Sequence, residues 1–339
     1  MVPVPGPTIR DVANLAGVSV ATVSRVISGS APVSPATRER VEEAMAQLGW
    51  RPNMAARSLV HGRTGLYGVI VPDVANPFFG ELATGMTREA ARLGIQIVML
   101  HTDFSEEQDL AALDLCREHR LDAVIYTSGT LGDAHRDAFR KLGRPVVLAA
   151  TFDPDGEWPG ILVDSEIGAR MGARHLLSLG HRKIALLGGP ETDQVAAGPR
   201  WRGWRAELAE AGCLPPAEWQ LEVRWKQQHG YQAAISLLRQ PEAPTAILCC
   251  SDMIALGVLA AAADLGISVP HELSVVGFDG QAIAGFWRPP LTTIGQPIGL
   301  IGREALHLAT RLVAGEEPPT TRWLTPELIV RGSTATPRR

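Results

Sequence analysis

The chain has 339 residues, of which 45% are hydrophobic and 20% charged, and its formal net charge is −4. This composition is typical of a water-soluble globular protein, and the length predicts two or three folded units. The sequence has no run of about 18 apolar residues, which excludes a membrane-spanning helix, and no apolar segment of signal-peptide length at its start. We therefore expect a cytoplasmic protein that has no contact with a membrane.

Charge is distributed unevenly along the chain. Residues 1–63 hold seven arginines and four acidic residues, a net charge of +3, so the remaining residues carry −7. A basic segment ahead of an acidic remainder suggests that only the N-terminal part contacts nucleic acid. The four cysteines show no C-x-x-C spacing, so we expect no disulfide, no metal site and no cofactor.

The first 51 residues predict three short helices. Thr8 and Ser19 are typical N-cap residues for the first two helices, and Ser34 followed by Pro35 begins a third. A four-residue turn separates the first two helices. Three short helices with this turn fit a helix-turn-helix domain.

The second helix has two different faces. Val23, Val26 and Ile27 follow helical spacing and should face the core. The opposite face carries Val20, Ala21, Ser24 and Arg25. In a DNA major groove, apolar groups would meet thymine methyls and the arginine would bind a guanine. The alternative from the pattern alone is a small helical domain with a solvent-exposed arginine.

A second part of the chain begins near residue 64. Apolar runs that resemble strands alternate with helical stretches in two successive sets. The runs cover residues 66–72, 95–100, 123–126 and 146–149, then 161–163, 184–187, 221–224, 246–250 and 274–276. This pattern predicts two doubly wound lobes with parallel sheets covered on both faces, and such lobes bind ligands at the carboxyl ends of their strands.

Several stretches resemble the lactose/galactose repressor family of bacterial transcription regulators. They are TIRDVANLAGVSVATVSRVISG, RPNMAARSL, GVIVPDVANPFF, DSEIGARMGARHLLSLGHRKIALLGG, SDMIALGVL, SVPHELSVVGFDG and PPLTTIGQP. The resemblance covers the whole chain in the family's order. It implies an all-α helix-turn-helix DNA-binding domain at residues 1–51, a hinge helix or linker at 52–63, and an α/β, periplasmic-binding-protein-like effector-binding and dimerisation domain at 64–339.

Within this last domain, the resemblance implies that the chain crosses three times between lobes. The N-lobe would comprise about 64–163 and 294–322, and the C-lobe about 164–293 and 323–339.

The resemblance also implies two partners: near-palindromic operator DNA, and a second copy of the chain. The homodimer would place two helix-turn-helix domains on the operator. The residues expected to contact DNA are Thr8, Ser19, Val20, Ala21, Thr22, Ser24, Arg25, Asn53, Arg57 and Leu59. Leu59 corresponds to the family's leucine that wedges between base pairs in the minor groove. No leucine heptad follows the last segment, so we expect a dimer.

A small-molecule effector is the second implied partner. Its expected binding residues are Asp73, Phe78, Phe79, Thr127, Arg200, Trp225, Ser251 and Asp279. Trp225 would pack against a sugar ring, while Arg200 and Asp279 would bond its hydroxyls. Taken alone, each aromatic residue is better explained by core packing.

Three departures from the family pattern bear on the effector. Ser251-Asp252 stands in place of the usual Asn-Asp, Asp279-Gly280 in place of a frequent Asp-Asp, and residues 149–151 read Ala-Ala-Thr in place of Val-Asp-Arg. The identity of the effector therefore does not carry over from the family.

Together these features predict a repressor of a carbohydrate-utilisation operon that is released by a sugar or sugar derivative. One alternative is a co-repressed regulator responding to a nucleobase or another metabolite. A solute-binding protein would share the effector-binding domain, but it would have a signal peptide and would lack the helix-turn-helix domain. We do not expect an enzyme, because the sequence has no catalytic triad or dinucleotide signature, and the glycine-rich stretch at 188–200 lacks the Lys-Ser/Thr of a phosphate-binding loop.

Overall fold

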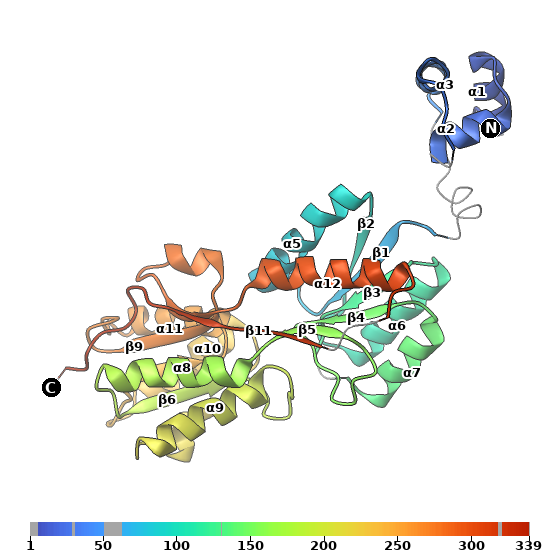
Figure 1. The fold of residues 1–339 in the computed structure, drawn as a ribbon. Helices are drawn as coiled ribbons and strands as arrows, with labels where there is room; N and C mark the ends of the chain where they lie inside the picture. The colour runs from blue at the N-terminus through green and yellow to red at the C-terminus, as the bar shows by residue number, and fades with distance from the viewer. Residues whose placement is uncertain (1–5, 29–30, 51–62, 130, 318–320, 339) are drawn as a thin grey trace, which may run out of the picture. The chain divides into compact units, whose positions relative to one another are not determined.

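The computed structural model describes residues 6–28, 31–50, 63–129, 131–317 and 321–338. The chain divides into two units, residues 1–65 and 66–339, each of which is described by itself (Figure 1). No helix in the described ranges is long and apolar enough to cross a membrane.

The described residues of the first unit form three helices, as the sequence predicts. They are α1 (Ile9–Ala16), α2 (Val20–Ser28) and α3 (Pro35–Leu48). Their core is small and aliphatic, with buried Val12, Ala13, Ala16, Val23, Val26, Val41 and Ala44. The turn after α1 depends on Gly17, whose φ of 64° lies in the left-handed region where a side chain would be strained.

The second unit contains two lobes, each built on a six-stranded sheet. The N-lobe sheet has the order β11-β5-β4-β3-β1-β2, and all its strands are parallel. Its strands are β1 (Leu66–Val71), β2 (Gln96–His101), β3 (Ala123–Tyr126), β4 (Val146–Ala149), β5 (Gly160–Val163) and β11 (Arg322–Leu324). Helices α5 (Pro77–Leu93) and α12 (Ile298–Val313) pack on one face, and α6 (Glu106–Glu118) and α7 (Asp133–Leu142) pack on the other.

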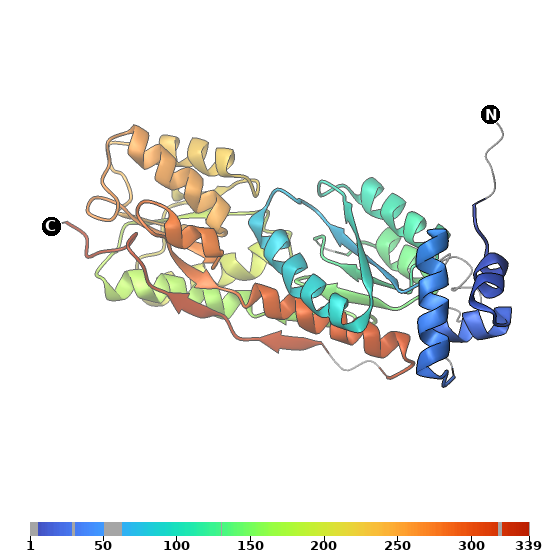
Figure 2. The ribbon, with the colours of Figure 1, turned by 90° about the horizontal axis from the view of Figure 1, so that it is seen from above.

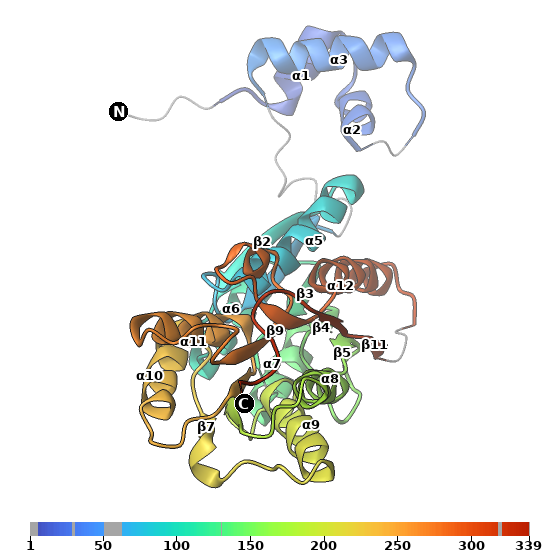
Figure 3. The same cartoon turned by 90° about the vertical axis from the view of Figure 1, so that its left-hand side faces the viewer.

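The C-lobe sheet has the order β12-β10-β9-β8-β6-β7, with only β12 antiparallel to its neighbour. Its strands are β6 (Ile184–Gly188), β7 (Gln220–Glu222), β8 (Ala246–Cys249), β9 (Ser274–Asp279), β10 (Thr292–Gly295) and β12 (Glu327–Ile329). Helices α8 (Ser165–Ser178) and α9 (Ala197–Glu210) lie side by side, as do α10 (Gln227–Leu238) and α11 (Asp252–Asp264) (Figure 3). Short 3-10 helices η1 (Ala217–Trp219) and η2 (Ala282–Phe286) complete the lobe.

The chain crosses between the lobes three times, and two crossings differ slightly from the sequence expectation. The first follows Val163, as expected. The second follows Gly295, because β10 pairs with β9 of the C-lobe up to that residue. The third follows Leu324, because β11 pairs with β5 of the N-lobe. The approximate positions expected for these two crossings lie within β10 and β11.

Helices α5 and α12 approach each other at glycines, and Figure 2 shows them running side by side. A Cβ atom at Gly85 would lie 2.1 Å from the carbonyl oxygen of Gly299, and one at Gly302 would lie 2.2 Å from that of Leu82. The two backbones are therefore too close for any side chain at either position.

We expect Gly302→Ala to destabilise the body by about 1–3 kcal/mol, because the added methyl group would push α5 and α12 apart. Gly299→Ala, in the same helix, is the matched control, since a Cβ atom there would have no neighbour within 4 Å. Alanine's higher helix propensity should leave that variant neutral or stabilised by at most about 1 kcal/mol. Urea unfolding of both variants measures the difference, and equal stabilities would contradict this account of the helix contact.

Candidate functional site

The exposed face of α2 is the first candidate site. Val20 is 40% exposed, and Ala21 and Arg25 are also exposed, while Val23 and Val26 on the opposite side are buried. The helix therefore presents a small apolar surface beside one arginine, as the sequence pattern predicts. Apolar side chains and an arginine can both contact base edges in a DNA major groove. Exposure of the same apolar side chains to bulk water would be less favourable.

Hydroxyl groups fix the starts of the first two helices. The Thr8 backbone NH and Oγ1 both donate to the Asp11 carboxylate at 2.7 Å. The Ser19 Oγ accepts from the Thr22 backbone NH at 3.1 Å, and the two hydroxyls are 2.9 Å apart. These contacts cap the first turns of α1 and α2. Asn53, Arg57 and Leu59, the other expected DNA contacts, lie outside the described residues.

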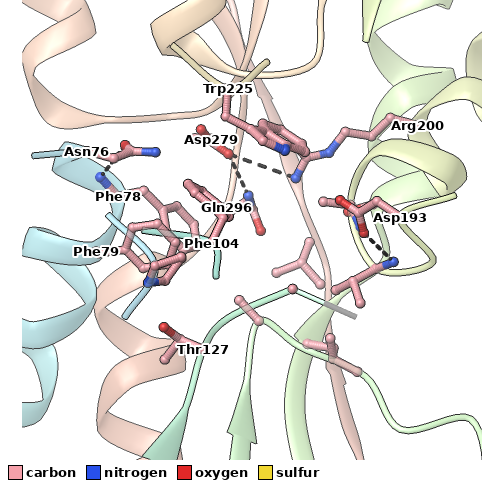
Figure 4. A pocket seen from close by; sticks show the side chains of 18 of the residues that line it. Asn76, Phe78, Phe79, Phe104, Thr127, Asp193, Arg200, Trp225, Asp279 and Gln296 are labelled. Carbon is pink, nitrogen blue, oxygen red and sulfur yellow. Dashed lines mark hydrogen bonds and ion pairs between the residues drawn. The ribbon is translucent and has the colours of Figure 1, made fainter. Parts of the chain in front are cut away.

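The second candidate site is a cavity of about 500 Å³ between the lobes of the body (Figure 4). The N-lobe contributes Pro72, Asn76, Phe78, Phe79, Phe104, Thr127, Gly129, Ala150, Leu162 and Val163 to its lining. The C-lobe and the crossing after β10 contribute Ser165, Pro190, Thr192, Asp193, Val195, Ala196, Arg200, Trp225, Asp279 and Gln296. Many of these residues end a strand or follow one directly, so the cavity lies where parallel sheets place ligands.

Arg200 supplies the positive charge among the described residues that line the cavity, and only 3% of its surface is exposed. It extends from the first turn of α9, and its Nη1 donates to the carbonyl oxygen of Cys250. Its Nη2 lies 3.9 Å from Asp279 Oδ1, and its guanidinium carbon lies 3.7 Å from the centre of the Phe278 ring. Its buried Nε has no hydrogen-bond partner among the described residues, so a ligand oxygen would satisfy it.

Asp279 faces Arg200 at the end of β9. Its Oδ1 accepts from Gln296 Nε2 at 2.8 Å. Burial raises the pKa of Asp279 to about 6, even though the charge of Arg200 and the bond from Gln296 oppose that rise. Ionised, this carboxylate is a strong acceptor for a ligand hydroxyl.

Asp252, the first residue of α11, is a second buried carboxylate near Asp279. Its carboxylate accepts from Thr293 Oγ1 at 2.5 Å and from the Gln281 backbone NH at 2.8 Å. Burial, and then the negative charge of Asp279, raise its pKa well above the usual value. Asp252 thereby ties α11 to β10 and to the loop after β9.

Aromatic side chains cover both sides of the cavity. Phe78 and Phe79 follow Pro77 at the start of α5, and their rings meet edge to face with centroids 5.1 Å apart. Asn76 caps this helix by accepting from the Phe78 backbone NH at 3.0 Å. Trp225 faces them from the C-lobe, with its ring centre 5.8 Å from the guanidinium carbon of Arg200 (Figure 4).

The structure brings most of the expected effector residues together and leaves two apart. Phe78, Phe79, Thr127, Arg200, Trp225 and Asp279 all line the cavity. Asp73 and Ser251 do not line it, because both cap backbone groups nearby. Asp73 Oδ1 accepts from the Ala75 backbone NH at 2.9 Å, and Ser251 Oγ accepts from that of Ile254 at 3.2 Å.

Of the twenty lining residues, fourteen were missing from the sequence expectation, among them Asn76, Phe104, Asp193 and Gln296. Asn76 and Gln296 lie within recognised stretches, VANPFF and TIGQP, and could have been found there. Phe104 and Asp193 lie in loops without a recurring pattern, so nothing in the sequence indicates them. Asp193 accepts from three backbone NH groups ahead of α9 and so shapes the loop that leads to Arg200.

Direct contacts join the two lobes at the rim of the cavity. Gln281 Nε2 donates to Asn76 Oδ1 at 3.1 Å, and the Ala282 backbone NH donates to Glu81 Oε1 at 2.9 Å. Both link η2 and its preceding residue to the start of α5. A change in the angle between the lobes must break or remake them.

Comparisons with known proteins match both units. Residues 8–53 match the model for bacterial regulatory proteins of the lacI family, and residues 173–334 match that for a periplasmic binding protein-like domain. Catabolite control protein A of Priestia megaterium is 35% identical over 309 residues, which cover 91% of this chain and 93% of that protein.

Two solved structures are similar along nearly the whole chain. One is the lac repressor dimer bound to operator and the anti-inducer ONPF, with a TM-score of 0.86, 32% identity and coverage of 98% of this chain and 100% of that one. The other is a complex of the transcriptional regulator CelR with cellobiose, with a TM-score of 0.73, 30% identity and coverage of 96% and 99%.

Proposed function

This chain belongs to the lacI family of DNA-binding bacterial transcription regulators, and we propose that it represses a carbohydrate-utilisation operon until a sugar or sugar derivative occupies the interlobe cavity. The observation that carries the effector proposal is the convergence of Arg200, Asp279 and Trp225 on one cavity. A stacking face beside two charged hydrogen-bonding groups fits a polyhydroxylated ring. The similarity to a regulator solved with cellobiose supports the same class of ligand.

For the DNA partner, we propose that α2 enters the major groove of a near-palindromic operator. Val20, Ala21, Ser24 and Arg25 would face the bases, while Thr8, Ser19 and Thr22 would lie near the backbone. Asn53, Arg57 and Leu59 remain proposed contacts of the segment between head and body. The twofold symmetry of such a site requires two heads, and the similarity to a lac repressor dimer on operator supports a homodimer. A regulator of this kind acts in the cytoplasm, where the chromosome is.

The coupling between effector and operator follows from the two-lobed body. A ligand that binds both walls favours one angle between the lobes and so alters the contacts of Asn76 and Glu81 with the C-lobe. Linkage requires operator DNA to weaken effector binding by the same factor by which effector weakens operator binding.

The test begins with an operator selected from random DNA by the purified protein. Fluorescence anisotropy with this operator is then measured with mono- and disaccharides, sugar acids, nucleobases and nucleosides. Release by a sugar supports the proposal. Release by a nucleobase alone would contradict the sugar assignment, and a ligand that tightens binding would identify a co-repressed regulator.

We expect the affinity for the effector to fall below about pH 6. Asp279 accepts a ligand hydroxyl only when ionised, and burial has raised its pKa to about 6 beside Arg200 and Asp252. At one pH unit below the pKa, about a tenth of the carboxyl groups is ionised, so binding at pH 5 should be roughly tenfold weaker than at pH 7.

Calorimetric titrations between pH 5 and pH 8 measure this dependence. Asp279→Asn is the control, since it should bind weakly at every pH and lose the step near pH 6. A wild-type affinity that stays constant across the range would mean that the carboxylate of Asp279 does not accept from the ligand.

A further inference from the structure

A tight turn after the edge strand β2 carries an aromatic ring to the interlobe cavity. The Ser105 backbone NH closes this turn by donating to the Thr102 carbonyl oxygen at 2.9 Å. Its two central residues, Asp103 and Phe104, have φ angles of 47° and 57°. A turn with two positive φ angles favours asparagine and glycine, so a phenylalanine within it is strained. Strain of this kind persists mainly where function requires it, which indicates a role for the Phe104 ring.

The Phe104 ring lies at the mouth of the cavity. It lines the cavity, yet 46% of its surface is exposed to solvent. Trp225 lines the cavity from the C-lobe and is also only half-buried (Figure 4). The two rings, one from each lobe, therefore lie where the cavity meets the solvent.

An ion pair joins the two lobes beside these rings. Asp103 precedes Phe104 and Lys226 follows Trp225, and the Asp103 Oδ1 lies 3.8 Å from the Lys226 Nζ. Both charged side chains are about half exposed, so dissolved salt screens their attraction. An exposed pair of this kind shifts an equilibrium by about 1.5- to 5-fold. That is enough to change how often the two rims separate, and too little to hold them together permanently.

Because the effector must enter the interlobe cavity under the proposed function, we propose that Phe104 and the Asp103–Lys226 ion pair form a gate at its mouth. The gate sets the rates at which a sugar-sized molecule enters and leaves. When it is closed, the Phe104 ring covers the entrance and the ion pair holds the turn against the C-lobe. When the ion pair breaks, the turn moves away from Trp225 and the entrance opens.

The test measures how easily a hexose-sized solute reaches Trp225, and it needs no effector. The full-length protein is labelled with fluorotryptophan, and the fluorine resonance of Trp225 is identified by its absence from a Trp225→Phe sample. The probe is hydroxy-TEMPO, a neutral paramagnetic six-membered ring with one hydroxyl. Its approach increases the relaxation rate of the fluorine nucleus, so the enhancement of that rate reports access to the cavity mouth.

Asp103→Asn removes the charge of the gate and keeps its backbone, because asparagine tolerates positive φ angles. We expect this variant to raise the relaxation enhancement at Trp225 by about 1.5- to 5-fold. A rise in salt concentration should increase the enhancement in the wild-type protein and leave Asp103→Asn nearly unchanged, since salt screens the ion pair that the variant lacks.

Lys226→Met and the double variant complete a mutant cycle. If both residues act through one ion pair, the double variant should give the same access as either single variant, and not the product of the two increases. Glu242→Gln is the matched control. It breaks an exposed lysine–glutamate pair, Lys183 Nζ to Glu242 Oε2 at 3.4 Å, that lies within the C-lobe and does not join the lobes, so access to Trp225 should stay at the wild-type value.

Phe104→Ala and Phe104→Gly separate the ring from the backbone strain. Both variants remove the ring and should raise access to Trp225 more than Asp103→Asn does. Glycine alone accepts a φ of 57° without strain, so Phe104→Gly should unfold at a higher temperature than Phe104→Ala. Equal unfolding temperatures would contradict the strained turn.

The outcomes separate this inference from the proposed function. Wild-type access to Trp225 in Asp103→Asn and in both Phe104 variants overturns the gate, whichever molecule the cavity binds. Increased access in the Phe104 variants alone, or multiplied increases in the double variant, overturns the ion pair as part of it. The probe is not an effector, so these results stand apart from the sugar assignment. Operator release by a nucleobase alone would overturn that assignment and leave the gate in place.

Discussion

Arg200→Ala is expected to weaken effector binding by about 2–5 kcal/mol, roughly 30-fold to several-thousand-fold, the range for removing one partner of a buried charged pair. The side chain is 3% exposed and contacts Asp279, the Cys250 carbonyl and the Phe278 ring. Its removal deletes the donor proposed for the ligand. It also takes away the charge that holds down the pKa of Asp279, so this carboxyl would be protonated at higher pH and would accept less well.

Arg202→Ala is the matched control for this prediction. Arg202 lies in the same helix, carries the same charge and is bonded at 3.0 Å to Glu166 on the exposed surface. It should bind effector within twofold of wild type. Calorimetry measures the affinities, and operator binding without effector should stay within threefold for both variants.

A second variant at the same position tests whether misfolding causes the loss of effector binding. Arg200→Lys keeps a positive charge near Asp279. A lysine ammonium group lacks the planar set of donors with which arginine can bond the Cys250 carbonyl and a ligand at the same time, so the loss of affinity should be intermediate. Thermal unfolding shows whether each variant is folded. Equal affinities of Arg200→Ala and Arg202→Ala would remove Arg200 from the binding site.

The sequence predicted the lobes because their strands are buried on both faces. Runs such as Val146–Ala149 and Ala246–Cys249 are apolar throughout, and this pattern separates them from the amphipathic helices between. The short strand β11 gave no such signal. It has three residues, and Trp323 within it is 54% exposed, so pattern alone could not locate the third crossing to the residue.

Some residues of the cavity could be predicted from the sequence, and others could not. Asp279 belongs to a recognised stretch, whereas Arg200 and Trp225 lie outside the quoted stretches and were placed by the resemblance to the family; all three line the cavity. Asp73 and Ser251 were expected there because short polar residues follow strands at the cleft edge. The same residue types also cap turns and helices, and the structure gives them that role. Only the folded loops reveal Phe104 and Asp193, since their place depends on tertiary contacts.

Arg25→Ala is the substitution with the largest expected effect on operator binding. Loss of one arginine–guanine contact costs about 1–3 kcal/mol, and a dimer on a two-fold operator loses it in both half-sites, which gives about 2–6 kcal/mol. Arg25 lies exposed on the face of α2 that also carries Val20 and Ala21, away from the buried Val23. The substitution should therefore leave the head folded.

A change in base preference distinguishes a residue that contacts base edges from a residue that contributes only positive charge. Arg40→Ala is the matched control, because Arg40 is exposed on α3 and its loss removes the same charge. Each variant selects its operator from a pool randomised at every position, and affinities are measured by anisotropy at one fixed salt concentration, since phosphate contacts depend on salt.

Arg25→Ala should lose preference at one base of each half-site, whereas Arg40→Ala should retain the wild-type consensus and lose affinity evenly for all sequences. Both variants lose one positive charge, so a simple electrostatic role would give them the same profile. If Arg25→Ala selected the wild-type consensus with wild-type affinity, α2 would not be the helix that reads the operator, and its exposed apolar face would need another explanation.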